Sequence, residues 1–513
     1  MMDRWNISSW ARLPRGDVSA PSALALRILP LPPRFNRDVD SAVHMKHGVY
    51  LKAEVIFHEL LLRLDRREEA TRGPAPLPLF FVPLYTGQLG SASVESGKRS
   101  SRLEEVDAAF ASLPPTLWPS RSMDFIFVVT VDRGRCFQDD NVDRFRDATV
   151  LMYEGTASYP RSEHAGKASR PPITFPCHSL TSDVVIPPVT DLGAHAMLPA
   201  RAPELRLPAN TSNSGAFPWH YFTHRKILFA WRGSSSRTAW AAGGSSISHA
   251  APAAAMGKPG VSDDAPLDVR GMLIQLYGRT HNATAARGDA RTVRALVESE
   301  HVSAAAPRQR QQQPTQQPQH SSQHSSQSQP RPPHASHAGQ SSRAAHHPST
   351  SLRLATPERL PVLLSTRKVD KLAHYLELRR ALFCLAPSGW ALWTVRFFEA
   401  ASLGCIPVTF LPQPSPLRMP FADELDYAQF SVNVPPRDVP RLRERLEAIA
   451  HNRSRLRALQ RALWAARPAF DWSDTSERGA FHRTLVQVAR RRGLLGARRG
   501  VRAQPDASEI ANA

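Results

Sequence analysis

The sequence predicts an α/β fold built on parallel β-sheet, and the segment 381–410 indicates it most clearly. Two short apolar runs of strand length flank a stretch whose apolar side chains recur at helical spacing. Pro387, Ser388 and Gly389 end the first run, and Gly404 follows the helical stretch as a C′ glycine does. Strands joined through so short a helix are expected to be parallel neighbours in one sheet.

Each element of this βαβ unit is predicted from its own residues. Residues 382–385 form the first strand, residues 394–403 the helix and residues 405–410 the second strand. A further apolar run at 227–231 also has the length and composition of a buried strand. A further buried strand is therefore predicted outside the βαβ unit.

The turn between the first strand and the helix is predicted to bind an anion. In open parallel sheets ligands lie beyond the carboxyl ends of the strands, and a helix N-terminus there offers free N–H groups. Ser388, Gly389 and Thr394 belong to this turn, and Arg396 and Glu399 follow on one helix face. A guanidinium for phosphate and a carboxylate for ribose hydroxyls suit a nucleotide diphosphate. A salt bridge between the last two residues on a solvated face is the alternative interpretation.

Arg232 is a further candidate for contact with phosphate. It ends the run 227–231, and Gly233 and three serines follow it in a turn that lets backbone approach a ligand closely. An ordinary surface arginine after a strand is the alternative.

The C-terminal residues closely resemble the signature of exostosin-like glycosyltransferases. That pattern runs FCL-P-G, S-x-R, an acidic residue, GCIPV, a PF pair and an "fsv" strand, and residues 383–432 contain these motifs in order. Thr394 stands where the family usually has Ser. Gly479 stands where the family usually has Asp before Ala-Phe, so a capping carboxylate is expected to be missing there.

Upstream motifs follow the family order and span most of residues 26–482. They are the opening "lPprfn", the Y-x-x-E-x-x-F helix, the "lFfVPfY" strand, the D-x-G-x-C turn, "DvviPp" and the "LLFFrG" strand, at 31–36, 50–57, 80–85, 132–136, 183–188 and 226–233. Two motifs depart from the family pattern. The opening strand at 26–29 lacks its aromatic-rich run, and residues 122–125 replace an aromatic-histidine pair.

The resemblance implies a GT-B architecture, with two Rossmann-like lobes facing across a cleft. It also implies transfer of a hexosyl or pentosyl group from a nucleotide-diphosphate sugar to a glycan or glycoprotein acceptor, with inversion. No separate cofactor and no metal are expected, because a helix N-terminus and basic side chains hold the diphosphate. Asp38, Val39 and Asp40 spell the DxD of the metal-dependent GT-A type, but no apolar strand leads into them.

The catalytic base of such an enzyme is expected in the N-terminal lobe, where Glu54 and Asp132 lie in family-like motifs. Each has a structural alternative. Glu54 would pair with Lys52 or His58, and Asp132 would hydrogen-bond its own turn.

The expected domain order follows from motifs and composition. An N-terminal tail, 1–23, precedes the acceptor-side lobe, 24–215, and the nucleotide-sugar lobe, 216–488, precedes a basic disordered tail, 489–513. Two low-complexity insertions, 241–266 and 304–350, are expected to interrupt the second lobe, because they hold too few large apolar residues to form a core.

The formal net charge of +20 raises the alternative of a nucleic-acid-binding protein. Arginines are scattered along the chain, however, and no basic stripe with a recognisable motif or interleaved aromatic residues is evident. The predicted partners are therefore a sugar donor and an acceptor rather than nucleic acid. A catalytically inactive GT-B glycan-binding or scaffold protein remains the other alternative.

The four cysteines have no CxxC spacing, which argues against a zinc or redox site. Pairing of Cys384 with Cys405 and of Cys136 with Cys177 would give two disulfides, and free buried thiols are the alternative.

The sequence also bears on the compartment. Four N-x-S/T sequons favour a secretory lumen. No apolar segment of the ~20 residues that span a bilayer is present, and residues 1–23 lack a signal-peptide core. The resemblance implies the Golgi lumen or membrane, with an N-terminal anchor absent from this chain. The sequons lie at Asn6, Asn210, Asn282 and Asn452.

Overall fold

The structure is a computed structural model, and its description covers only part of the chain. The chain divides into one compact unit of residues 1–280 with 361–513 and a second of residues 281–360. The second unit lies almost entirely outside the described residues, as do both expected insertions, Asp132 and the DxD tripeptide. The described residues are 24–32, 35–36, 52–68, 79–86, 102–130, 134–136, 145, 147–156, 178–190, 192, 222, 225–233, 269–277, 360–366, 369–389 and 392–495.

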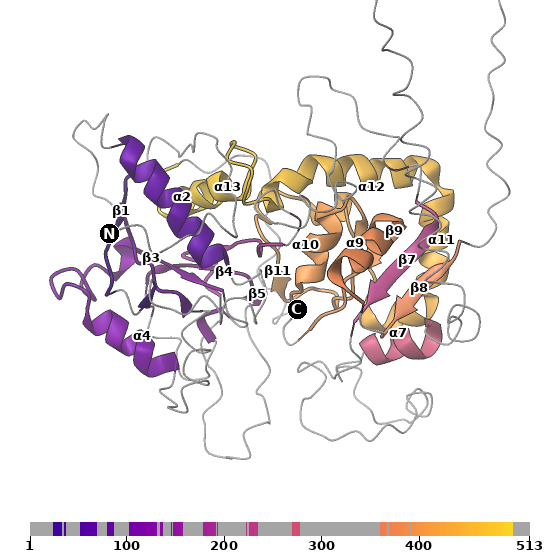
Figure 1. Ribbon diagram of the computed structural model, residues 1–513, viewed down its shortest axis with the longest axis horizontal. Helices are drawn as coiled ribbons and strands as arrows, with labels where there is room; N and C mark the ends of the chain where they lie inside the picture. Colours follow the sequence, from indigo (N-terminus) through magenta and orange to yellow (C-terminus); the bar gives the residue numbers. More distant parts are fainter. Residues whose placement is uncertain are drawn as a thin grey trace, which may run out of the picture. The chain divides into compact units, whose positions relative to one another are not determined.

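The N-terminal part of the first unit contains a five-stranded parallel sheet in the order β1-β2-β3-β4-β6 (Figure 1, indigo to magenta). All five residues of β3 are buried, as expected of a strand covered on both faces. The strands are β1 Leu26–Ile28, β2 Leu79–Phe81, β3 Phe125–Val129, β4 Thr149–Met152 and β6 Val184–Val185, and the helices α2 Ala53–Glu68 and α4 Arg102–Ala111 accompany them.

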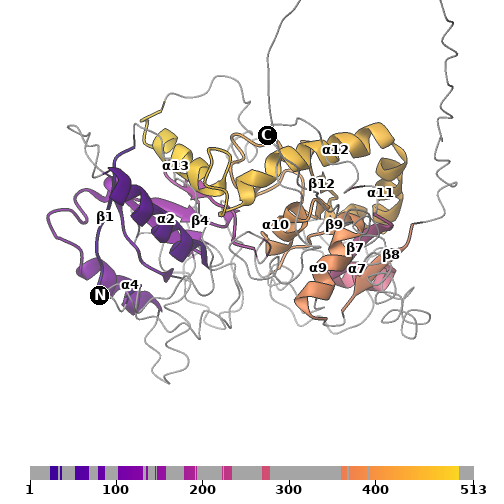
Figure 2. The ribbon, with the colours of Figure 1, turned by 45° about the horizontal axis from the view of Figure 1, so that its top comes forward.

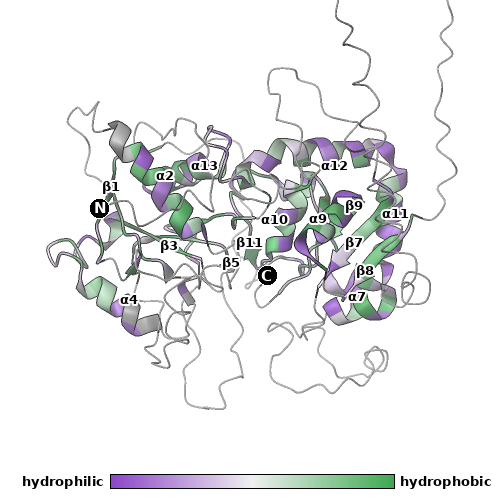
Figure 3. Cartoon of the chain, in the orientation of Figure 1, coloured by the Kyte–Doolittle hydropathy of each residue, from purple (hydrophilic) through white to green (hydrophobic). Residues whose placement is uncertain are grey.

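A second five-stranded parallel sheet has the order β12-β10-β9-β7-β8 (Figure 1, magenta and orange). Its central strands β7 and β9 are largely apolar, which Figure 3 shows for β7 as a mostly green arrow. The strands are β7 Ile227–Arg232, β8 Val362–Ser365, β9 Ala381–Leu385, β10 Ile406–Thr409 and β12 Val432–Asn433. The α-helices after α4 in the described residues are α7 Val269–Tyr277, α9 Lys371–Arg379, α10 Val395–Ser402, α11 Leu442–His451, α12 Arg453–Ala466 and α13 Ala480–Arg491.

Two parallel sheets with helices confirm the predicted α/β class. A two-stranded antiparallel pair also joins β5 to β11. A Cβ on Gly155 of β5 would come within 2.6 Å of Arg418, so only glycine allows the two strands to approach so closely. These strands are β5 Gly155–Thr156 and β11 Leu417–Arg418, and the short 3₁₀ helices are η4 Ser122–Asp124, η5 Gly134–Cys136, η9 Tyr427–Gln429, η10 Pro436–Arg441 and η11 Arg467–Phe470.

The predicted βαβ unit is confirmed as β9, α10 and β10. The strands β9 and β10 pair in parallel, with Phe383 opposite Ile406. Thr394 is the N-cap of α10, and its hydroxyl accepts a bond from the Arg396 N–H at 3.4 Å, so threonine keeps the capping role of the usual serine. Gly404 ends the helix with a φ of 64°, the left-handed conformation expected of a C′ glycine.

The predicted disulfide between Cys384 and Cys405 is also present. The two Cα atoms lie 5.8 Å apart on neighbouring strands, so the bond ties β9 to the residue just before β10. The other predicted pair lies outside the described residues, because neither the Cys136 side chain nor Cys177 is described.

The C-terminal boundary of the second lobe differs from the prediction. Helix α13 packs on the first sheet's core, where the Phe481 ring lies 5.4 Å from the ring of Phe57 in α2 (Figure 2). The apolar side chains on one face of α13 pack against this core, so the chain returns to the N-terminal sheet after the second one. Ala489 is buried and α13 continues to Arg491, so residue 489 does not begin the expected tail. Gly479 caps α13 without a side-chain bond, as predicted from the missing Asp.

Among the described helices, none combines the length and apolarity needed to cross a membrane.

Candidate functional site

The predicted anion-binding turn follows β9 and leads into α10. Within it, the Ser388 hydroxyl donates to the Leu392 carbonyl at 3.1 Å, which stabilises the turn. A Cβ added to Gly389 would lie 3.5 Å from a guanidinium nitrogen of Arg270 in α7, so an arginine of α7 borders this turn. The turn and the capped start of α10 thus lie at the carboxyl end of a parallel strand, where anions bind in such sheets.

Arg396 and Glu399 lie together on α10, as their spacing predicted. Their side chains approach to 3.9 Å. Glu399 is only 9% exposed and accepts a hydrogen bond from the Tyr375 hydroxyl at 2.9 Å. Nη1 of Arg396 also lies 2.9 Å from Nε2 of His374. The pair is therefore a salt bridge, as the alternative supposed, but the carboxylate is buried rather than on a solvated face.

Arg232 is held firmly at the end of β7. Its guanidinium forms a two-point ion pair with Glu377, in which Nη2 donates to Oε1 at 2.5 Å and Nε donates to Oε2. The two side chains are 13% and 12% exposed, so Arg232 is not an ordinary surface arginine. Fork-to-fork pairing of this kind fixes the plane of the guanidinium as well as its position.

One short helix, α9, contacts all three charged residues predicted for the site. Its His374 contacts Arg396, its Tyr375 binds Glu399 and its Glu377 pairs with Arg232. No sequence pattern singles out α9 for this role. The only signal is that His374, Tyr375 and Glu377 lie near one another on a helix, and polar side chains in such a position are most often solvated. The partners are 22 to 145 residues away in sequence, so spacing alone does not reveal them.

The charges around α9 favour an anion. Burial, then Arg396, Arg232 and Lys371, lower the pKa of His374 to about 3, so its imidazole is neutral at neutral pH. Nε2 accepts from Arg396, and the ring proton is therefore assigned to Nδ1. Burial also lowers the pKa of Lys371. Two arginines and a lysine face two carboxylates here, which leaves a net positive charge for a ligand to neutralise.

Tyr375 stays protonated in this arrangement. Its pKa is raised well above the usual value by burial first and then by the neighbouring Glu399 carboxylate. The neutral phenol can donate a hydrogen bond to Glu399, and this bond from α9 orients the carboxylate of α10.

Glu54, a predicted base, lies in the first turn of α2 beside the first sheet. Its Oε1 accepts from the Thr86 hydroxyl at 2.6 Å, the Thr130 hydroxyl at 2.9 Å and the Thr130 N–H at 3.2 Å. Thr86 and Thr130 come after β2 and β3, so the carboxylate lies at the carboxyl ends of parallel strands. Glu54 is 1% exposed. His58, one predicted partner of Glu54, lies instead 2.9 Å from the Tyr85 hydroxyl. The role of Glu54 as base stays a prediction, as does that of Asp132.

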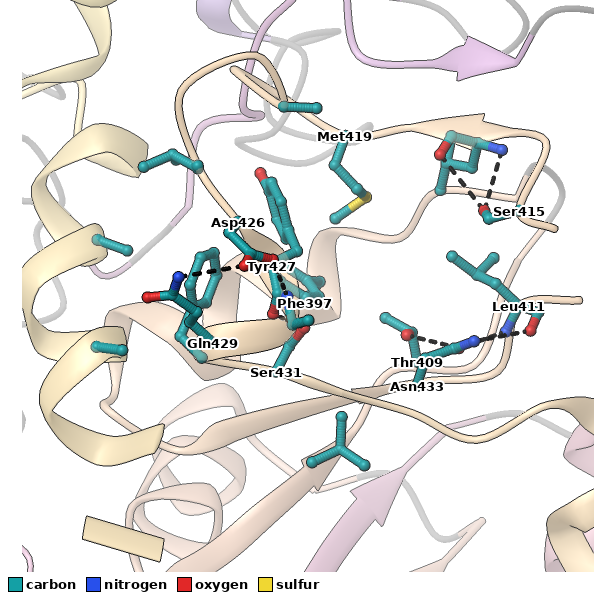
Figure 4. A pocket seen from close by; sticks show the side chains of 18 of the residues that line it. Phe397, Thr409, Leu411, Ser415, Met419, Asp426, Tyr427, Gln429, Ser431 and Asn433 are labelled. Atoms are coloured by element: carbon teal, nitrogen blue, oxygen red, sulfur yellow. Dashed lines mark hydrogen bonds between the residues drawn. The ribbon is translucent and has the colours of Figure 1, made fainter. Parts of the chain in front are cut away.

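A cavity of about 1290 Å³ has Phe397 of α10 in its lining (Figure 4). The lining also includes the loop after β10 and residues of α11 and α12, but none of the predicted site residues. Asn433 organises one wall, because its amide accepts from the Thr409 hydroxyl and the Leu411 N–H and donates to the Leu411 carbonyl (Figure 4). The cavity is thus separate from the group formed by α9 with Arg232, Arg396 and Glu399.

Among the described residues, no group of three or more His, Cys, Asp or Glu side chains is placed to hold a metal ion. The metal independence implied by the resemblance remains an expectation.

Comparisons with known proteins agree with the motifs. Residues 276–449, which include α9, β9, α10 and β10, match the Exostosin GT47 domain. A probable glucuronosyltransferase of Oryza sativa subsp. japonica is 45% identical over 69 residues, 14% of this chain and 16% of that protein. A probable beta-1,4-xylosyltransferase of Arabidopsis thaliana is 35% identical over 125 residues, 23% of this chain and 28% of that protein. A probable glucuronoxylan glucuronosyltransferase of Arabidopsis thaliana is 39% identical over 87 residues, 17% and 18% of the two chains.

The matched stretches span less than a third of these relatives' own length. The family-model match, residues 276–449, includes the predicted turn, the capped helix α10 and the helix α9. Residues 276–449 are thus similar to the Exostosin GT47 domain, which confirms the predicted resemblance to exostosin-like glycosyltransferases.

Proposed function

We propose that this protein is an exostosin-like glycosyltransferase of the GT-B type, with two Rossmann-like lobes facing across a cleft. It transfers a hexosyl or pentosyl group from a nucleotide-diphosphate sugar to a glycan or glycoprotein acceptor. The observation that carries the proposal is the cluster of Arg232, Arg396 and Glu399, which α9 holds beside the anion-binding turn. The relatives' names suggest glucuronosyl and xylosyl groups as the first donors to test.

The residues of the cluster have distinct proposed roles. The N–H groups at the start of α10 and the turn with Ser388 and Gly389 receive the diphosphate. Arg232 and Arg396 stabilise the negative charge that develops on the leaving diphosphate, and their fixed partners mean that little reorganisation is needed. Glu399 accepts a ribose hydroxyl through the oxygen that faces Arg396. A base of the other lobe, with Glu54 and Asp132 as candidates, deprotonates the acceptor hydroxyl, and that oxygen displaces the diphosphate with inversion.

We also propose that the protein acts in the Golgi lumen. The disulfide between Cys384 and Cys405 supports this, because such bonds persist in oxidising compartments and are rare in the cytosol. The sequon at Asn452 lies at an exposed position before α12, where a glycosylating enzyme would reach it.

Arg396→Ala is expected to weaken donor binding about ten- to a hundredfold, because a charge-assisted bond to phosphate is lost. A thermal-shift panel of nucleotide sugars measures this, since a ligand of the native state raises the unfolding midpoint according to its affinity. Arg441→Ala is the control. Arg441 is 70% exposed and forms an ion pair with Glu444, so its loss should not change donor binding. Absence of binding by the parent protein, or unchanged affinity in a folded Arg396→Ala variant, would contradict the proposal.

His374→Leu is expected to lower donor affinity about tenfold, because Arg396 loses the acceptor that orients it. His374→Gln, which restores an acceptor on a side chain of similar length, should recover most of the affinity. The decisive measurement is a double-mutant cycle with Arg396→Ala. If His374 acts through Arg396, the two changes together cost less than the sum of the single changes. Additive costs would show that His374 has no such role.

A further inference from the structure

Glu154 is a buried carboxylate at the carboxyl end of the first sheet. It follows β4 by two residues, comes directly before β5 and is 1% exposed. A glutamate is almost never buried so deeply unless its oxygens accept hydrogen bonds, because removing a charge from water is costly. The donors that contact this carboxylate therefore indicate what it does.

The hydrogen bonds of Glu154 connect the first sheet with the start of α10. Its Oε1 accepts from the Thr156 hydroxyl at 2.7 Å and from the Leu392 N–H at 3.2 Å. Thr156 belongs to the adjacent β5, whereas Leu392 is 238 residues away in sequence. Leu392 lies between the anion-binding turn and Thr394, the N-cap of α10. One buried oxygen beside the first sheet thus contacts the segment that joins the turn to the helix.

Leu392 is held through both of its backbone polar groups. Its N–H donates to Glu154, and its carbonyl accepts from the Ser388 hydroxyl at 3.1 Å. Leu392 and Trp393 are buried in the same apolar core as residues of the first sheet. The centre of the Trp393 ring lies 5.1 Å from the centre of the Tyr153 ring. The two residues that follow β4 therefore hold the two residues that precede the N-cap.

The segment that carries Glu154 is itself fixed on both sides. All residues of β4 before it are buried. After it, β5 pairs antiparallel with β11 (Figure 1), in the close approach to Arg418 that Gly155 permits. A carboxylate on so constrained a segment can hold its partner in one position.

The position of residues 392–394 matters because α10 begins there. The N–H groups of a helix N-terminus attract an anion when they point at it, so their direction decides how well they bind. Such groups stabilise charge best when neighbouring contacts already hold them in place, because little reorganisation is then needed. Thr394 fixes the cap from within the helix, by accepting from the Arg396 N–H. The bond from Leu392 to Glu154 adds a support from outside the helix.

We propose that Glu154 is a positioning residue of the donor site. It holds Leu392, and with it the segment between the anion-binding turn and the N-cap, in the arrangement that receives the diphosphate. The inference rests on the proposed function, because it gives Glu154 a part in donor binding at that same site. Glu154 acts through Leu392 and does not touch the donor, so the site requires the reach of its side chain rather than its charge.

Two variants separate the reach of Glu154 from its charge. Glu154→Gln keeps an acceptor oxygen at the same distance from the backbone but removes the charge. Glu154→Asp keeps the charge on a side chain that is shorter by one methylene group. The control for a merely structural effect is Thr484→Val, which removes a buried hydrogen bond of α13, from the Thr484 hydroxyl to the Ala480 carbonyl.

The full-length protein is used throughout. Donor affinity is measured by thermal-shift titration with UDP-glucuronate and UDP-xylose, and turnover by initial rates at saturating donor. Circular dichroism shows whether each variant is folded.

Glu154→Asp is expected to bind the donor about tenfold more weakly, because its carboxylate no longer reaches Leu392 and the start of α10 is misplaced. Glu154→Gln should keep donor affinity and turnover within about threefold of the parent, since the acceptor is retained. Thr484→Val should lower the unfolding midpoint without changing donor affinity. In a double-mutant cycle, Glu154→Asp and Ser388→Ala together should cost less donor affinity than the sum of the single changes, because both act on Leu392.

Unchanged donor affinity in Glu154→Asp would overturn the inference, as would an equal loss in Thr484→Val or additive costs in the cycle. A tenfold loss of donor affinity in folded Glu154→Gln would also overturn it, because that variant retains the reach. A fall in turnover of about 10²-fold or more in Glu154→Gln, with donor affinity intact, would make Glu154 the catalytic base instead. Failure of the proposed function is seen separately, as absence of nucleotide-sugar binding by the parent protein.

Discussion

Replacing Glu54 with glutamine is expected to lower turnover about 10²- to 10⁴-fold while nucleotide-sugar affinity stays unchanged. The amide keeps an oxygen at the place where Thr86 and Thr130 donate, so the contacts of Oε1 are retained. What is lost is the ability to accept a proton. The position after β2 and β3 supports this role, because ligands of parallel sheets lie beyond the carboxyl ends of the strands. Initial rates at saturating donor, with thermal-shift titration of the donor, give the two quantities.

Two further variants separate catalysis from structure. Thr86→Val removes one hydrogen bond to Glu54 but leaves the carboxylate, so it should keep turnover within a few fold of the parent. Glu54→Ala leaves the hydroxyls of two buried threonines without their acceptor and should destabilise the fold by about 1 to 3 kcal/mol for each group left unsatisfied. If Glu54→Gln keeps turnover near that of the parent, the base lies elsewhere, and Asp132→Asn becomes the next variant to measure.

The sequence predicted the βαβ unit accurately because its determinants are local. Strand-length apolar runs, a capping Thr394 and a stopping Gly404 each act within a few residues of their own position. The disulfide between Cys384 and Cys405 followed from the same unit, since neighbouring parallel strands bring the two residues together. Local signals of this kind do not depend on the rest of the fold.

The contacts that α9 makes with Arg232, Arg396 and Glu399 could not be predicted in the same way. Glu377 meets Arg232 only because β7 and β9 are neighbours in the sheet, although 145 residues separate the two side chains in sequence. The burial of Glu399 depends likewise on Tyr375 of α9. Return of α13 to the N-terminal sheet is also a long-range effect, since the partners of its apolar face include Phe57, which lies far earlier in the sequence. Periodicity shows that a helix has an apolar face but not what that face covers.

Asp183→Ala is expected to destabilise the protein by about 3 to 5 kcal/mol, the largest effect on stability predicted here. Asp183 is fully buried, and its two oxygens accept from Arg135 at 2.7 and 2.5 Å. They also accept from the N–H groups of Ser179 and Val150, at 2.8 and 3.2 Å. The carboxylate thus joins the start of β4 to the turn before β6 in the first sheet. Its removal leaves the Arg135 guanidinium, 4% exposed, as an uncompensated buried charge.

Chemical denaturation followed by circular dichroism measures this change. Asp423→Ala is the matched control, because Asp423 also contacts arginines, Arg418 and Arg491, but is 42% exposed. Water screens such a pair, so the control should lose about 1 kcal/mol or less. The loss of stability in Asp183→Asn should lie between those of Asp183→Ala and Asp423→Ala, since the amide keeps one acceptor oxygen but loses the charge that balances Arg135. If Asp183→Ala costs no more than the control, the buried pair does not stabilise the first sheet, and the sheet must depend on apolar packing alone.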